Sequence, residues 1–135
     1  MDDYIDQIRA AHQPAAYPKS LPNDEQIVQV EEQVYMPMPS DLRAFLLTVS
    51  DVICGSLEPV TAADPFEHTY LPEVAALAWD HGMPRFLLPI CAFDQGYYYI
   101  DPDGGVGRWL EGDEEEGEIE WPNLWEWAIA VWINS

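Results

Sequence analysis

The fold of this chain is decided by residues 86–110, FLLPICAFDQGYYYIDPDGGVGRWL. Three runs rich in apolar residues, at 85–93, 96–101 and 106–112, are separated by the turn-forming sequences DQG and PDGG. Gly, Asp and Pro favour tight turns, whereas β-branched and aromatic residues favour strands. The segment therefore predicts a meander of three antiparallel strands.

Helical periodicity precedes this meander. Residues 2–12 carry apolar side chains on one face, and the prolines of QPAAYPKSLP, residues 13–22, then impose an extended connector. A second helix is predicted to begin at Asn23, because Asn23 and Gln26 have capping-box spacing. A third helix is predicted to begin with Ser40 as its cap.

The remaining segments complete the secondary structure. Residues 51–61, DVICGSLEPVT, are short and β-branched, which predicts a strand broken by Gly55. Residues 70–84 predict a helix that Gly82 terminates. Residues 122–134 predict a closing helix, in which Trp127 lies beside the core-facing stripe rather than in it. Helices, a three-stranded meander and a final helix together predict an α+β domain with one mainly antiparallel sheet.

The charge of the chain is unusual for its length. Its 135 residues include 25 acidic and five basic side chains, a formal net charge of −20, whereas small domains need a magnitude of only about 2–8 for solubility. Such an excess disfavours binding to nucleic acid and to anionic membranes, because both require Lys and Arg. We expect a cationic partner instead, most naturally a basic protein.

Targeting signals and disulfides are not expected. Residues 1–13 lack the basic start and apolar centre of a signal peptide, and no apolar run approaches the roughly 20 residues of a membrane helix. Cys54 and Cys91 lie in apolar sequence without C-x-x-C spacing, which is typical of buried thiols in a reducing compartment. These features predict a cytoplasmic protein.

The candidate binding segment is EGDEEEGEIEW, residues 111–121. Its seven carboxylates are Glu111, Asp113, Glu114, Glu115, Glu116, Glu118 and Glu120, and Trp109 and Trp121 flank them. Exposed aromatic residues within a charged rim often form binding hot spots. Two alternatives stay open: the acidic residues form only a solvated loop, and the two tryptophans belong to the core.

No catalytic, cofactor or metal site is predicted. An EF-hand loop beginning at Asp101 would need Gly and Glu where Val106 and Gly112 stand. A Cys–His dyad of Cys91 with His68 or His81 is disfavoured, because Cys91 lies within an apolar strand. A weak divalent-ion site among the carboxylates of residues 113–120 is a minor alternative.

Three segments resemble the SUKH superfamily, the Smi/Knr-type domains. Residues 24–51 resemble its opening pair of helices, residues 86–109 its central meander, and residues 121–132 its closing helix. The three segments occur in the family's order and span residues 21–132, preceded by an N-terminal helix and Pro-rich connector at 1–20. One departure is that the glycine after the third helix comes late, at Gly55.

The resemblance implies a single SUKH-like domain over residues 1–135 and a role without enzymatic activity. Bacterial SUKH proteins include immunity proteins that neutralise a cognate secreted toxin domain, often a nuclease. The fungal relatives are regulators of cell-wall synthesis, so an intracellular regulatory or scaffold module is the alternative. An acidic protein that covers a nuclease's phosphate-binding surface would also associate rapidly, because opposite charges steer the encounter.

Overall fold

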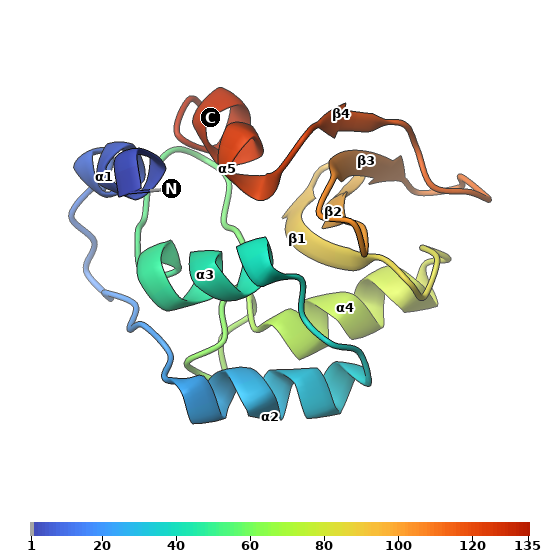
Figure 1. Cartoon of the computed structure of the whole chain (residues 1–135), viewed down its shortest axis with the longest axis horizontal. Coiled ribbons are helices and arrows are strands. Elements are labelled where there is room, and N and C mark those ends of the chain that lie inside the picture. The colour runs from blue at the N-terminus through green and yellow to red at the C-terminus, as the bar shows by residue number, and fades with distance from the viewer. Residues whose placement is uncertain (1) are drawn as a thin grey trace.

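The computed structural model describes residues 2–135 and confirms an α+β domain (Figure 1). Its elements are α1 (Asp2–Ala10), α2 (Asp24–Val34), α3 (Ser40–Val49), α4 (Leu71–Asp80), β1 (Leu88–Phe93), β2 (Gly96–Ile100), β3 (Val106–Leu110), β4 (Ile119–Trp121), α5 (Leu124–Trp127) and the π-helix η1 (Ala128–Trp132). Helix α4 lies between the sheet and α2, while α1 packs against α3 and η1 (Figure 1).

The sheet is antiparallel with the strand order β1-β2-β3-β4. The meander prediction is confirmed, since Ile100 pairs with both Leu88 and Val106. The fourth strand was not predicted, because its three residues lie within the acidic segment. Strand β4 pairs Trp121 with Val106, and the register shifts between Val106 and Gly107.

The helix starts show one prediction confirmed and one wrong. The Asn23 side chain accepts a hydrogen bond from the Gln26 backbone N–H, and the Gln26 side chain accepts one from the Asn23 N–H, at 2.8 and 2.9 Å. Ser40, in contrast, is the first residue of α3 and does not cap it. Pro39 occupies the cap position without a side-chain hydrogen bond.

The strand predicted at residues 51–61 does not form. The segment is irregular and contributes two isolated bridges, Pro59 with Cys91 and Thr61 with Tyr70. Proline has no backbone N–H to donate, so Pro59 cannot continue a ladder of hydrogen bonds. The β-branched residues are instead buried individually, as Val52 and Val60 are.

The closing helix is shorter and wound differently than predicted. It begins with Asn123, whose side chain accepts from the Glu126 N–H at 2.9 Å, and it becomes a π-helix from Ala128. Trp127 is completely buried rather than beside the core stripe. A π-helix brings residues five apart onto one side, so Trp127 and Trp132 both face the interior.

The core joins all layers of the fold. Phe45 of α3 contacts Trp125 and Trp132, with ring centroids 5.9 and 5.4 Å apart. Tyr4 of α1 stacks on Trp125 at 6.5 Å and donates a hydrogen bond to Glu126. Indole and phenyl rings bury more apolar area than any other side chains, so these contacts provide much of the stabilisation.

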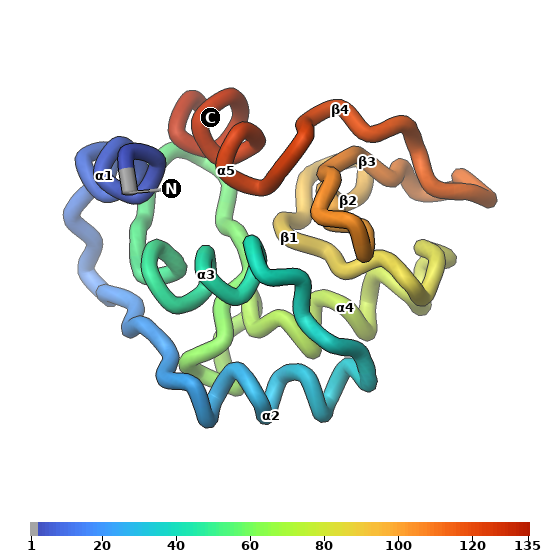
Figure 2. The backbone as a smooth tube through the Cα atoms, in the orientation of Figure 1, coloured from blue at the N-terminus to red at the C-terminus, as the bar shows by residue number. Residues whose placement is uncertain are grey.

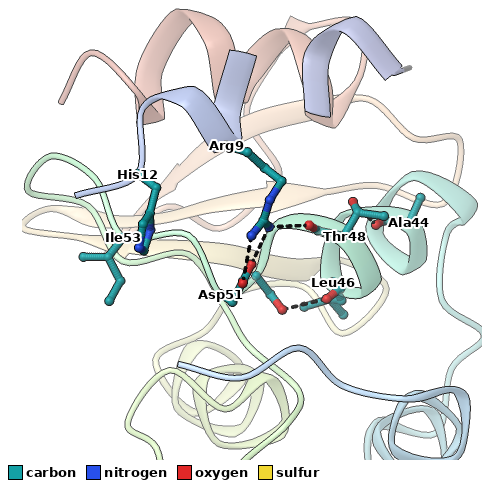
Figure 3. A network of polar contacts seen from close by, with 8 residues as sticks. Arg9, His12, Ala44, Leu46, Thr48, Asp51 and Ile53 are labelled. Atoms are coloured by element: carbon teal, nitrogen blue, oxygen red, sulfur yellow. Dashed lines mark hydrogen bonds and ion pairs between the residues drawn. The ribbon is translucent and has the colours of Figure 1, made fainter. Parts of the chain in front are cut away.

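A polar network fastens α1 to the end of α3 (Figure 3). The Arg9 guanidinium donates to both carboxylate oxygens of Asp51 at 2.7 and 3.1 Å and to the Thr48 carbonyl at 2.9 Å. The hydrogen bonds to Asp51 raise the pKa of Arg9 above its ordinary value. The Ile53 backbone N–H donates to Nδ1 of His12 at 3.0 Å, which extends the attachment beyond the helix.

Candidate functional site

The acidic segment forms the connection between β3 and β4. We call residues 111–118 the acidic loop. It projects from the end of the molecule opposite α1, as the backbone trace in Figure 2 shows. All of its carboxylate side chains are exposed. The loop is therefore directed into solvent rather than folded onto the helices.

Both ends of the acidic loop are held by hydrogen bonds to buried aromatic side chains. The Tyr99 hydroxyl donates to the Gly117 carbonyl at 2.7 Å, and Nε1 of Trp109 donates to the Asp113 carbonyl at 3.2 Å. Gly117 also lies against the backbone of β3, where a Cβ would be only 2.5 Å from the Arg108 carbonyl oxygen, so a glycine is needed at this position. The loop therefore has a fixed base and an exposed tip.

Tyr99 remains a hydrogen-bond donor over the whole physiological pH range. Burial raises the pKa of its phenol to about 12, and the negative charges of Glu116, Asp101 and Glu120 add to the shift. The Tyr99–Gly117 bond is therefore insensitive to pH near neutrality.

Three of the seven carboxylates have internal partners. Glu120 accepts two hydrogen bonds from Arg108, at 2.8 and 2.6 Å, which lower its pKa. Glu111 lies 3.1 Å from Nδ1 of His81, and Asp113 accepts from the Leu110 N–H at 3.2 Å. These three side chains stabilise the loop and its flanking strands.

The other four carboxylates are unengaged within residues 2–135. Glu114, Glu115, Glu116 and Glu118 are exposed and form no ion pair or side-chain hydrogen bond there. Three of the five basic side chains pair with carboxylates other than these four: Arg9 with Asp51, Arg43 with Asp24 and Arg108 with Glu120. These four carboxylates form the tip of the acidic loop, and their charge is available to a partner.

The two flanking tryptophans differ. Trp109 is completely buried and stacks on Tyr97, with centroids 6.3 Å apart, so it is a core residue and is not accessible to a partner. Its alternation in β3 places it on the covered face of the sheet. Trp121 is half-buried and lies edge-on to Tyr98 at 5.9 Å, with Arg108 at 6.0 Å from its ring. Of these two tryptophans, only Trp121 offers aromatic surface near the acidic loop.

An aromatic residue that sequence reasoning missed lies beside the tip. Phe86 is 48% exposed and lines a hollow together with Pro84, Glu114, Glu115 and Glu116. It is distant from the acidic loop in the sequence, in the apolar run before β1. No pattern in that run marks one residue as exposed.

The residues weighed for catalysis are engaged elsewhere. Cys91 is buried, its thiol donates to the Ala92 carbonyl at 3.4 Å, and burial raises its pKa to about 12. His68 contacts Glu58 at 2.8 Å. Within residues 2–135, no three His, Cys, Asp or Glu side chains are arranged to hold a metal ion. Asp101 instead closes a turn by accepting from the N–H groups of Asp103 and Gly105.

Comparisons with known proteins give one family and one structure. The family model described as SMI1-KNR4 cell-wall (SUKH_5) matches residues 1–133. A crystal structure of a protein from Pseudomonas syringae pv. tomato is similar, with a TM-score of 0.93 and 47% sequence identity over 100% of both chains. No match was found among curated proteins. Within residues 2–135, no helix has the length and apolarity needed to cross a membrane.

Proposed function

The chain belongs to the SUKH family, and we propose that it is a non-enzymatic immunity protein that neutralises a basic toxin domain through its acidic loop. The observation that carries this proposal is the exposed tip, where Glu114, Glu115, Glu116 and Glu118 have no internal partners within residues 2–135. Family membership supports a binding role, and the charge supports a basic partner.

The arrangement of the loop suits an electrostatic encounter. Like charges gathered at one tip repel one another, and a basic surface relieves that repulsion on binding. Because the base of the loop is fixed by Tyr99 and Trp109, the tip charges need little reordering when a partner arrives. A nuclease toxin fits this description, since it presents Lys and Arg to phosphates.

The proposal includes the cytoplasm as the place of binding. Cys54 and Cys91 are both free and buried, which suits a reducing compartment. A toxin domain that reaches the cytoplasm would meet its inhibitor there. The alternative partner is a resident regulatory protein, as expected from the cell-wall regulators of the family. Finding a toxin-like reading frame beside the gene would favour the immunity role.

If the reading frame next to the gene of this chain encodes a toxin-like domain, the test is stopped-flow binding to that domain. The loop variant replaces Glu114, Glu115, Glu116 and Glu118 with Gln and keeps Asp113, whose carboxylate holds the Leu110 N–H. We expect the association rate to fall about three- to tenfold and its salt dependence to flatten, because exposed charges act over about 8 Å at physiological salt.

The matched control removes four exposed carboxylates far from the acidic loop. It carries Gln at Glu25, Glu32 and Glu73 and Asn at Asp6. This variant has the same net charge as the loop variant, so its association rate separates local from global electrostatics. An equal loss of rate in both variants, or no loss in the loop variant, contradicts the proposed role of the loop.

A further inference from the structure

An apolar groove lies next to the acidic tip. It has a volume of about 260 Å³ and is lined by three segments that are distant in sequence. The α2–α3 connection contributes Met36, Pro37, Met38 and Pro39, the start of β1 contributes Phe86 and Leu88, and the end of β2 contributes Ile100, Asp101 and Pro102. Leu88 and Ile100 are buried and form its floor.

The walls of the groove combine fixed backbone with adaptable side chains. Tyr35 ends α2 in the left-handed conformation, with φ of 58°, and Glu31 accepts a hydrogen bond from the Met38 N–H at 2.9 Å. These features and the prolines hold the connection in place. Met36 and Met38 are half-buried, and methionine adjusts its flexible thioether chain to differently shaped apolar ligands.

Phe86 connects the groove to the acidic loop. Its ring lines both the groove and the hollow that contains Glu114, Glu115 and Glu116. Asp101 also lines the groove, and none of the residues that line the two hollows is basic. The guanidinium of the neighbouring Arg85 lies over the Trp79 ring, 4.0 Å from its centroid. The apolar surface is therefore bordered by negative charge.

We propose that this groove receives one large apolar side chain from a basic segment of the partner, whose flanking Lys and Arg contact Glu114, Glu115 and Glu116. The inference rests on the proposed function and specifies the partner's chemistry at the same surface. The groove is smaller than the roughly 300–1,000 Å³ of sites for drug-sized ligands, so it suits a single side chain. Apolar contact at the centre and charge at the rim is the usual arrangement of a protein interface.

The probe is a set of three synthetic peptides observed through methionine methyl signals. The first peptide has a central Phe between Lys-Arg pairs, the second replaces Phe with Ser, and the third replaces Lys and Arg with Gln. Met36 and Met38 line the groove, whereas Met83 is buried and lies outside it, so its methyl signal is an internal control.

We expect the first peptide to shift the Met36 and Met38 methyl signals and to leave Met83 unchanged. The Ser peptide and the Gln peptide should each bind the groove at least fivefold more weakly, since each lacks one of the two contacts. Phe86→Ala should weaken the first peptide about five- to tenfold. Phe66→Ala, at an exposed phenylalanine outside the groove, is the matched control and should change nothing.

Each contrary outcome has a defined meaning. Unmoved Met36 and Met38 signals, or equal responses to the Phe and Ser peptides, overturn the groove inference. If the backbone amides of residues 114–118 still respond to the Ser peptide, the acidic surface of the proposed function survives that failure. An equal response to the Phe and Gln peptides removes the requirement for a basic partner. If Phe86→Ala alters the Met83 signal, the milder Phe86→Leu takes its place. Phe86→Leu should weaken binding of the first peptide about twofold, and an unchanged affinity contradicts the inference.

Discussion

The acidic loop and the tryptophan-rich segment 124–132 are close neighbours in the sequence and opposite in structure. The loop exposes all its carboxylates, whereas Trp125, Trp127 and Trp132 of the later segment are buried. Charged and aromatic residues that follow one another in the sequence are therefore separated in space, the first in solvent and the second in the core. The apolar part of the candidate surface comes from Phe86 and the groove instead.

The largest expected effect tests the buried tryptophan-rich segment 124–132. Trp132→Ala removes a fully buried indole that packs on Phe45 and should lower the free energy of unfolding by ~3–5 kcal/mol. Urea denaturation measures this change.

The matched substitution at the same position is Trp132→Phe. Within residues 2–135, Nε1 of Trp132 has no hydrogen-bond partner, so Phe loses no hydrogen bond. We expect a cost of ~1–2 kcal/mol. A cost equal to that of the alanine variant would contradict this expectation.

A smaller effect tests the attachment of the acidic loop to the sheet. Tyr99→Phe removes the hydroxyl that donates to Gly117, which should cost ~0.5–1.5 kcal/mol and loosen the base of the acidic loop. Hydrogen exchange of the amides of residues 117–120 should accelerate, while that of β1 should not. Unchanged exchange would mean that the Trp109–Asp113 bond alone holds the loop.

The smallest effect concerns acid pH. Arg108 lowers the pKa of Glu120 in the folded state, so the pair contributes stability above the unfolded pKa of about 4.5 and loses it as the pH falls through the folded value. Because the pair is largely exposed, the contribution is at most ~1 kcal/mol. Denaturation of the wild-type chain and of Glu120→Gln at pH 6 and pH 3 should show a difference that disappears at the lower pH. A constant difference would contradict this account.

The sequence predicted those parts of the fold that depend on local chemistry. The Asn23–Gln26 cap and the turns of the meander need only nearby residues, and both formed. The π-helix and the irregular path of residues 51–61 depend on how the core is filled, which local periodicity does not describe. Strand β4 had a weak signal, the alternation of Glu118, Ile119, Glu120 and Trp121, which the density of charge concealed.

The candidate site was predictable only in its charged part. A run of carboxylates is visible in any sequence, and their exposure follows from the cost of burying charge. Which of them have partners depends on residues such as His81 and Arg108, which the fold brings to the loop. The groove is lined by residues 36–39, by Phe86 and Leu88, and by residues 100–102, whose proximity is a property of the whole fold.

Strand β4 also has a consequence for the protein at high concentration. An unpaired strand edge can add a strand from another copy, which begins aggregation. Here the outer edge of the sheet is only three residues long, is irregular in register and carries Glu120 beside Glu118. A second copy that approached this edge would bring the same negative charges with it, so the β4 edge resists the addition of a further strand.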